Sequence, residues 1–422
     1  MNTPKEYRGL WYLPENPENK IGGILTFDDS VKISLELFGC FDENPDYIKK
    51  LFEKEVTTLN TIYGITSDSK KITLFDCYEY LNINSANNVY LSNYTCRYVI
   101  EGDHFESING KNFYKIACHS PLISLWKHPG IIKNSFSFCD QEETIKRVTV
   151  SADKNSYWEK AFNINNNYKL LLNSEGNFNN DFQRTKFEFT QTTRLSITCP
   201  IEKKSMPELL EKLILGYNFI TLATMSLSGI SNILLYTEES NDSNPITLYY
   251  AKKKEKQTKV HLENFLFSYD SIEDIFSEVI LKWFQESERL APIRNHLIHS
   301  IQSKNSFLSI DFLTLVQSLE GYHRRFINHK DLNLKSRLKE LLFLFNTVEV
   351  IRECNINLEV IVKTRNYYSH FFDKVDKVLS GQNLYNETKK LRVLLICCIL
   401  SLTGFSNDKI NELLNKRQSY IH

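Results

Sequence analysis

The sequence has 422 residues, 42% hydrophobic and 24% charged, which is ordinary for a globular protein of two or three domains. Its net charge of zero argues against an unspecific nucleic-acid binder, and no apolar run approaches the roughly 18 residues of a membrane span. Because the first residues lack a signal peptide's hydrophobic run and the nine cysteines never form Cys-x2-Cys, we expect a cytoplasmic protein without disulfides, metal, cofactor or membrane contact.

Short alternating apolar runs, broken by Asn, Asp, Gly and Ser, extend from about residue 8 to residue 198 and predict a β-rich region. The expected strands are residues 23–26, 31–38, 59–66, 71–80, 88–100, 145–150 and 186–198. Two Asn-rich segments, 163–167 and 177–180, are expected to form loops. Together these segments predict a twisted sandwich or a barrel-like sheet.

A helix interrupts the strands, from Met206 to about Ser228. Pro207 suits its first turn, and apolar residues follow at helical spacing. Two further strands, 232–236 and 246–250, are separated by a turn-forming segment and predict a hairpin.

A lysine-rich run occupies residues 252–256. We interpret it as a solvated strand end or linker, and binding of RNA or another acidic partner is the alternative. The domain boundary is placed here, between a β-rich N-terminal domain at 1–255 and an all-helical domain at 256–422. The chain is therefore predicted to be an α+β protein with two domains.

After residue 271 the pattern changes to long helices, because apolar residues recur at i, i+3 and i+4. Helices are expected at 272–290, 311–327, 334–345, 358–372, 384–401 and, in a shorter form, 408–416. Pro292 is expected to break the first, which would separate Arg294 and His299 from the main helices. Residues 251–422 carry 26 Lys and Arg against 20 Asp and Glu, a net +6, so this half is the one suited to phosphate.

One helical segment carries three side chains suited to phosphodiester chemistry: Arg365, Asn366 and His370. At about 100° per residue, Asn366 and His370 share a face, and Arg365 points about 140° away but can curl back. The spacing alone is weak evidence, because an Arg precedes a His by five positions at four places in the chain. Only Arg294-Asn295 and Arg365-Asn366 also have the Asn, and the long uninterrupted helix favours the second.

Such residues can cut RNA without a metal. Histidine suits both proton transfers, from the ribose 2′-hydroxyl and to the leaving 5′-oxygen, because its ordinary pKa lies near neutrality. Arginine grips the phosphate through two donors and stabilises the transition state, and Asn366 could orient His370 or the phosphate. The alternative for His370 is a purely structural role, as a half-buried helix histidine that forms a hydrogen bond with a neighbouring residue.

Three motifs resemble the HEPN superfamily and, more closely, its ApeA-like branch of bacterial abortive-infection proteins. The first is Arg-Asn-x3-His at 365–370, in a late helix of a bundle. The second, at 312–324, is similar to the Phe-Leu…Glu-x2-His-Arg helix of that branch. The third is Arg-Gly-Leu-Trp-Tyr-Leu-Pro at 8–14 followed by Gly-Gly-Ile-Leu at 22–25, similar to the start of the ApeA N-terminal domain.

The resemblance implies a helical-bundle endoribonuclease with Arg365, Asn366 and His370 as catalytic residues and 2′,3′-cyclic phosphate ends on its products. It also implies a homodimer through the helical domain, in which two motifs face one cleft and share the two proton transfers. RNA, with transfer RNA as one candidate, would be the substrate. The N-terminal domain would restrain this toxin until a phage-derived trigger arrives.

Four further residues are candidates for contacting the substrate or supporting the catalytic residues: Glu320, His323, Arg324 and Lys363. The alternative for the first three is a surface ion pair between Glu320 and Arg324 with His323 as a bystander.

Two other functions stay open. One is a non-catalytic HEPN module that binds RNA or a nucleotide, or pairs with an antitoxin. The other is a β-rich ligand-binding protein with a helical dimerisation domain. The complete Arg-Asn-x3-His motif favours the enzyme, because a binding module has no need of the histidine.

Overall fold

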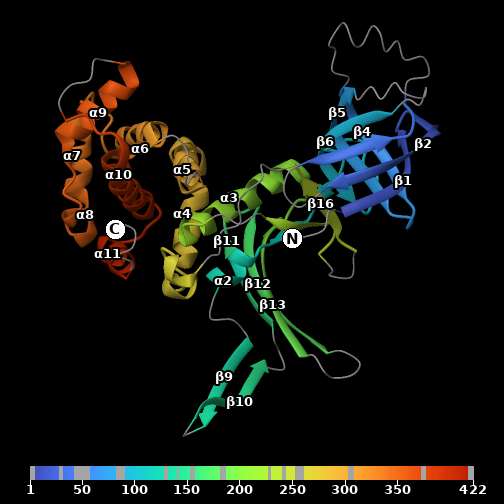
Figure 1. Cartoon of the computed structure of the whole chain (residues 1–422), viewed down its shortest axis with the longest axis horizontal. Helices are drawn as coiled ribbons and strands as arrows, with labels where there is room; N and C mark the ends of the chain where they lie inside the picture. Colours follow the sequence, from blue (N-terminus) through green and yellow to red (C-terminus); the bar gives the residue numbers. More distant parts are fainter. Residues whose placement is uncertain are drawn as a thin grey trace.

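The computed structural model describes residues 5–27, 32–41, 58–81, 91–127, 132–139, 142–152, 157–180, 187–226, 230–239, 244–251, 261–302, 308–371 and 377–416. Sheets dominate the N-terminal part and helices the C-terminal part, as Figure 1 shows. This arrangement confirms the predicted α+β fold with a barrel-like sheet ahead of a helical bundle. The lysine run at 252–256 lies outside the described residues.

Six antiparallel strands close into a barrel at the N-terminus. In spatial order they are β1 (Lys5–Leu13), β2 (Asn16–Phe27), β3 (Ile33–Leu37), β6 (Ser92–Glu101), β5 (Lys71–Leu81) and β4 (Thr58–Thr66). β4 pairs back onto β1, so this sheet returns to its first strand. Closure satisfies the backbone groups that an open edge would expose.

Trp11 lies at the centre of the barrel and is fully buried. A Cβ on Gly64 would lie 2.4 Å from the Trp11 ring, and one on Gly23 would lie 3.0 Å from it. Both strands therefore need glycine at these positions, because any side chain would collide with the indole. The Trp in the Arg-Gly-Leu-Trp segment is thus the packing centre of this domain.

A second sheet branches from the barrel at β6. Residues 92–96 of β6 pair with β3, whereas residues 98–101 pair along the same edge with β16. From there the order is β16 (Ile246–Tyr250), β15 (Ser231–Tyr236), β8 (Lys115–His119), β13 (Phe187–Thr198), β12 (Lys169–Asn180) and β11 (Tyr157–Asn163). The predicted hairpin of the two strands now called β15 and β16 is confirmed.

The prediction of a loop at 177–180 is wrong. These residues end β12 and pair in register with residues 187–190 of β13. The rings of Phe178 and Phe189 face each other across the pair at a centroid distance of 4.8 Å. A cross-strand aromatic pair of this kind stabilises a sheet enough to override the loop preference of asparagine.

Smaller elements complete this half. They are β7 (Asn112–Phe113), β14 (Lys204–Ser205), α2 (Pro121–Trp126), and β9 (Ile132–Cys139) with β10 (Glu142–Ala152). Among the strands that the structure describes, β9 and β10 pair with each other alone, and they project away from the main sheet in Figure 1.

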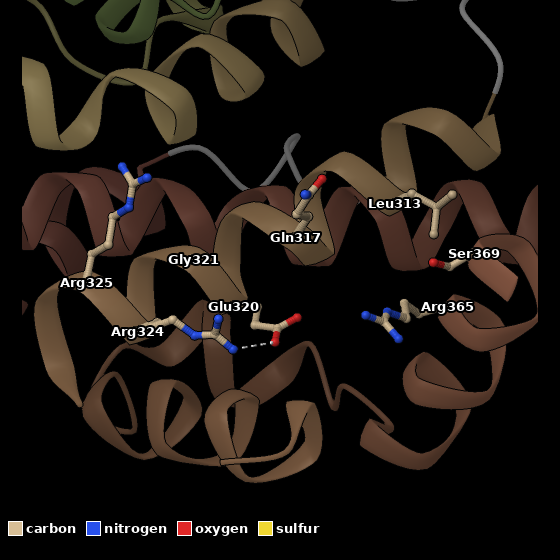
Figure 2. A pocket seen from close by; sticks show the side chains of 8 residues that line it. All are labelled: Leu313, Gln317, Glu320, Gly321, Arg324, Arg325, Arg365 and Ser369. Atoms are coloured by element: carbon tan, nitrogen blue, oxygen red, sulfur yellow. Dashed lines mark ion pairs between the residues drawn. The ribbon is translucent and has the colours of Figure 1, made fainter. Parts of the chain in front are cut away.

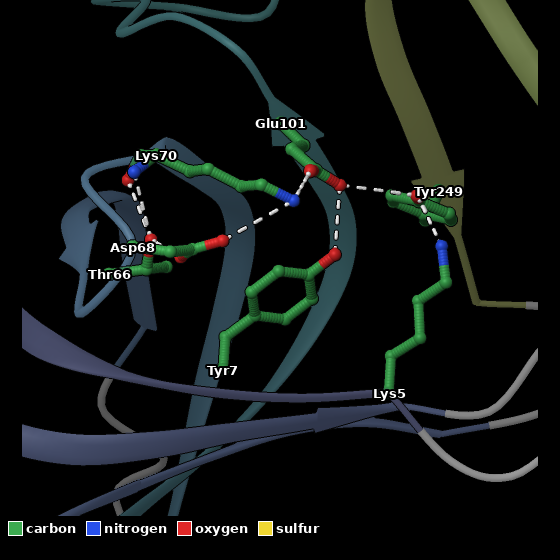
Figure 3. Close-up of polar contacts among 7 residues, drawn as sticks. All are labelled: Lys5, Tyr7, Thr66, Asp68, Lys70, Glu101 and Tyr249. Carbon is green, nitrogen blue, oxygen red and sulfur yellow. Dashed lines mark hydrogen bonds and ion pairs between the residues drawn. The ribbon is translucent and has the colours of Figure 1, made fainter.

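A polar cluster around Glu101 lies where β6 pairs with both β5 and β16 (Figure 3). The Glu101 carboxylate accepts hydrogen bonds from Lys70 Nζ at 2.7 Å, Tyr7 OH at 2.9 Å and Tyr249 OH at 3.2 Å. Lys5 Nζ in turn donates to the Tyr249 hydroxyl at 2.6 Å. Burial acts to raise the pKa of Glu101, but the bonds from Lys70 and Tyr7 outweigh it and leave that pKa lowered.

Replacing Glu101 by glutamine is expected to lower the melting temperature at pH 7 and to matter progressively less as the solution is acidified. The folded pKa lies below the unfolded value of about 4.3, so the carboxylate stabilises the fold above that value and loses this effect as pH falls through the folded pKa. Melting curves of both proteins between pH 7 and pH 3 should therefore converge. Glu18→Gln, at an exposed position on β2, serves as the control, and a pH-independent gap would contradict the assignment.

The second sheet and the helices share one hydrophobic core, whereas most of the barrel interior forms a separate cluster around Trp11. α3 (Met206–Thr224) confirms the helix predicted in this region, although it ends four residues earlier, and it packs on β8 and β13. α4 (Phe276–Gln285) packs against it, with the Phe219 ring 5.4 Å from that of Trp283 and 5.9 Å from that of Phe276. Trp283 Nε1 also donates to a backbone carbonyl of α3 at 2.9 Å.

The helical bundle is built around α10. Its elements are α5 (Ser287–Gln302), α6 (Leu308–Tyr322), the π-helical turn η3 (His323–Ile327), α7 (Leu334–Leu344), α8 (Glu349–Glu353), α9 (Leu358–His370), α10 (Gly381–Leu402) and α11 (Asn407–Asn415). Residues 393–400 of α10 are buried without interruption, and both cysteines there are core residues, as expected. Arg392 ties α10 to its neighbours through Asp311 and Ser300, each at 2.8 Å.

The prediction that Pro292 breaks a helix is wrong. Pro292 lies inside α5, and the break falls earlier, at Glu286 between α4 and α5. Pro292 is on the exposed side of α5, where water can satisfy the carbonyl of Glu288 that lacks its N–H partner.

Candidate active site

Helix α9 is fixed at both ends and thereby positions the motif. The Asn357 side chain caps its N-terminus by accepting hydrogen bonds from two backbone amides at 3.1 and 3.2 Å. Ile361 and Thr364 form its buried face, and Thr364 Oγ1 also accepts a bond from the backbone that follows the helix, at 3.1 Å. The helix ends at His370 because Phe371 adopts the left-handed conformation, with φ 56° and 90% of its surface exposed.

The three motif side chains contact one another. Arg365 Nη1 lies 3.0 Å from His370 Nε2 and donates to Asn366 Oδ1 at 3.1 Å. A guanidinium group only donates, so Nε2 accepts and carries no proton in this arrangement. The long side chain of Arg365 therefore bridges the angle that separates it from His370 on the helix, as predicted.

Arg365 points into a cavity of 480 Å³ between α6 and α9 (Figure 2). Its lining consists of Leu313, Gln317, Glu320, Gly321, Arg324, Arg325, Arg365 and Ser369. His370 and Asn366 do not line it; they contact Arg365 from outside, on the partly exposed surface of α9. The histidine is thus placed beside the basic cavity rather than within it.

The cavity wall is predominantly basic. Three arginines, Arg324, Arg325 and Arg365, line it together with one carboxylate, Glu320, whose nearest oxygen is 3.5 Å from Arg324. One carboxylate against three guanidinium groups leaves a net positive charge, which suits a phosphate. Arginine is also the side chain that binds phosphate through a fork of donors.

The wall opposite α9 is formed by α6 together with the π-helical turn η3, and a buried arginine holds η3 in place. Arg337 of α7 is fully buried and donates to three backbone carbonyls of the segment 328–332, at 3.1, 2.7 and 3.1 Å. Its Nη1 also lies 3.0 Å from Nδ1 of His323, the first residue of η3. Since Arg337 only donates, the His323 proton resides on Nε2, which lies 2.7 Å from the Glu340 carboxylate.

Of the four supporting residues predicted from the sequence, two line the cavity. Glu320 and Arg324 lie on α6 and η3, across from Arg365. His323 is fully buried and contacts α7 instead. Lys363 is exposed on α9 and does not line the cavity.

The other Arg-Asn-x3-His segment is arranged differently. Arg294 is 8% exposed, its guanidinium carbon lies 5.7 Å from the Trp283 ring centre, and its Nη1 donates to the Ser287 carbonyl at 3.1 Å. Burial lowers the pKa of Arg294. Asn295 and His299 are exposed, so the arginine and the histidine of this segment face different surroundings.

Sequence reasoning missed Gln317, Gly321, Arg325 and Ser369. Helical spacing was the available signal, because Gln317, Gly321 and Arg325 succeed one another at four-residue intervals and Ser369 follows Arg365 by four. No comparable pattern marks Arg337, whose role depends on contacts with a turn.

Within the described residues, no group of three or more His, Cys, Asp or Glu side chains is arranged to hold a metal ion. In the same part of the chain, none of the helices has both the length and the apolar character required to cross a bilayer.

Comparison with protein-family models gives two matches. Residues 6–283 match the model described as ApeA N-terminal domain 1, and residues 313–409 match the model described as Apea-like HEPN. The second match contains His370 and all eight residues that line the cavity. No curated protein and no solved structure matches the chain.

Proposed function

This chain belongs to the ApeA N-terminal domain 1 family, and on that premise we propose that it is an endoribonuclease that acts as an anti-phage, abortive-infection effector in the cytoplasm. The observation that carries the proposal is the 3.0 Å contact between Arg365 and His370 at the edge of a basic cavity. The three arginines that line this cavity would bind a phosphate group of the RNA backbone.

In the proposed reaction, the scissile phosphate binds Arg365 and the cavity arginines. The phosphate competes for the guanidinium donors, which releases His370 Nε2 to take the proton of the 2′-hydroxyl. The 2′-oxygen attacks phosphorus, the 5′-oxygen leaves with a proton, and a 2′,3′-cyclic phosphate remains. Arg365 stabilises the charge that develops on the phosphate oxygens, and Asn366 orients the guanidinium.

Two proton transfers call for two acid–base groups. We propose that a second copy of the chain supplies the other histidine, so that two motifs meet in one cleft of a homodimer. The exposed position of His370 on α9 is compatible with this role. Lys363, exposed on the same helix, would contact the RNA backbone outside the cavity, whereas Glu320 and Arg324 would contact the substrate within it.

The N-terminal domain is proposed to restrain the nuclease until a phage-derived trigger binds. Its continuous core with α3 and α4 supports coupling between the two parts. We also propose that the boundary between the N-terminal domain and the helical domain lies near residue 255.

The test is to incubate purified protein with total RNA, including transfer RNA, in EDTA and to map the product ends. Metal-independent cuts that leave 2′,3′-cyclic phosphates are expected. RNA binding without cleavage would identify a binding module instead, and neither binding nor cleavage would favour a ligand-binding protein with a helical dimerisation domain. Light scattering on the same sample measures the expected dimer.

A further inference from the structure

A second, smaller cavity adjoins the one that contains Arg365. Its volume is 150 Å³, and its own residues include Pro292, His296 and Ser318. Gln317, Gly321 and Arg325 line both cavities. The two are therefore parts of one depression that extends over α6 from α9 to α5. Figure 2 shows the three shared residues along the α6 side of the larger cavity.

Gly321 is the floor of this depression. A Cβ built there would meet no atom within 4 Å, and the residue has ordinary helical geometry. Glycine in the interior of a helix costs about 1 kcal/mol relative to alanine, and packing does not require it here. The missing side chain leaves room at the point where the two cavities join.

His296 presents an acceptor in the smaller cavity. Its Nδ1 lies 2.8 Å from Ser318 Oγ, and that hydroxyl donates its only proton to the Thr314 carbonyl at 2.7 Å. Ser318 must therefore accept from His296, which places the histidine proton on Nδ1 and leaves Nε2 as an acceptor in the neutral ring. The tautomer is thus fixed by the helix that forms the floor.

Arg325 is held in place between the two cavities. Its Nη1 donates to the Arg289 carbonyl at 2.7 Å, and Arg289 Nη2 donates back to the Arg325 carbonyl at 3.1 Å. The Arg289 guanidinium also stacks over the Phe326 ring at 4.7 Å. A guanidinium fixed in this way contributes its remaining donors without a large loss of side-chain entropy.

We infer that the smaller cavity is a nucleotide subsite beside the scissile phosphate. The nucleobase lies over Gly321 against Pro292, with a donor on its edge bonded to His296 Nε2, and its phosphate contacts Arg325. Proteins discriminate single-stranded RNA sequences by hydrogen bonds between side chains and the edges of unstacked bases, and the fixed acceptor on His296 can form such a bond. This inference rests on the proposed ribonuclease function and assigns the residues that select the sequence around the cut.

Filling the floor tests the subsite. Gly321→Leu is expected to reduce the cleavage rate at least tenfold without lowering the melting temperature, and Gly321→Ala is expected to reduce it less. Ser277→Leu is the control for an added leucine, because Ser277 is exposed on α4 and lines neither cavity. A wild-type rate and an unchanged cut-site distribution in Gly321→Leu would overturn the subsite.

His296→Ala separates selection from chemistry. The variant is expected to change the base preference at the nucleotide next to the cut, as read by sequencing product ends, and an unchanged preference would overturn the role of His296. If the wild-type protein cleaves no RNA, the proposed function fails independently. The subsite is then decided by fluorescence anisotropy with a 2′-O-methyl RNA oligonucleotide, for which Gly321→Leu should bind at least tenfold more weakly and equal affinity would overturn the subsite.

Discussion

Replacing His370 by alanine is expected to lower the rate of RNA cleavage about 10²- to 10⁴-fold, the usual contribution of a positioned acid–base group. The ring lies 3.0 Å from Arg365 and is exposed at the end of α9, so its removal leaves no buried cavity. Thermal stability and the dimer should therefore persist. Initial rates with a fluorescent RNA measure cleavage, melting curves measure thermal stability, and light scattering measures the dimer.

The matched control for this variant exists in the chain itself. His299→Ala changes the same residue type in the same Arg-Asn-x3-His spacing, but its arginine, Arg294, is buried against Trp283. This variant is expected to cleave RNA at the wild-type rate. A loss confined to His299→Ala would move the reaction centre to α5 and remove the assignment of α9, and equal losses in both variants would contradict a site built on α9 alone.

Replacing Arg337 by methionine is expected to lower the free energy of unfolding by about 3–5 kcal/mol, because it leaves buried partners of a charged group unsatisfied. Arg337 is fully buried, and its loss would leave three backbone carbonyls and His323 Nδ1 without their donor. Methionine fills a similar volume, so the loss reports mainly on hydrogen bonding. Urea unfolding followed by tryptophan fluorescence measures it.

Two further variants show whether geometry or charge matters at this position. Arg337→Lys keeps the charge but not the planar fork that reaches several carbonyls, and is expected to recover little of the lost stability. Lys335→Met removes a half-exposed cation from the same helix and should leave unfolding nearly unchanged. If Arg337→Met unfolded at the same urea concentration as Lys335→Met, η3 would not depend on this arginine.

Local patterns predicted most elements of the fold because each strand or helix buries one face at its own period. The helix that carries Arg365 and His370 was visible in this way, and so were β4, β5 and β6. Closure of the barrel was not visible, because the return pairing of β4 onto β1 joins residues more than fifty positions apart. The loop predicted at 177–180 failed for a related reason, since the Phe178–Phe189 contact forms only across strands.

The candidate site divides in the same manner. Arg365, Asn366 and His370 lie within six residues: helical geometry puts Asn366 and His370 on one face, and the long Arg365 side chain reaches them. Arg325 and Gly321 depend on how α6 packs against α5 and α9, and the two cavities follow from that packing. Arg337 was out of reach of sequence reasoning, because an arginine on an amphipathic helix is ordinarily assigned to the solvent side.

Strand β6 has a mechanical consequence. Since one of its edges is divided between β3 and β16, the barrel cannot swing away from the second sheet without tearing backbone hydrogen bonds in the middle of a strand. A displacement of the barrel is therefore transmitted along β6 to β16 and the rest of the second sheet. The hydrogen bonds of this shared strand limit how far the barrel can move relative to the second sheet.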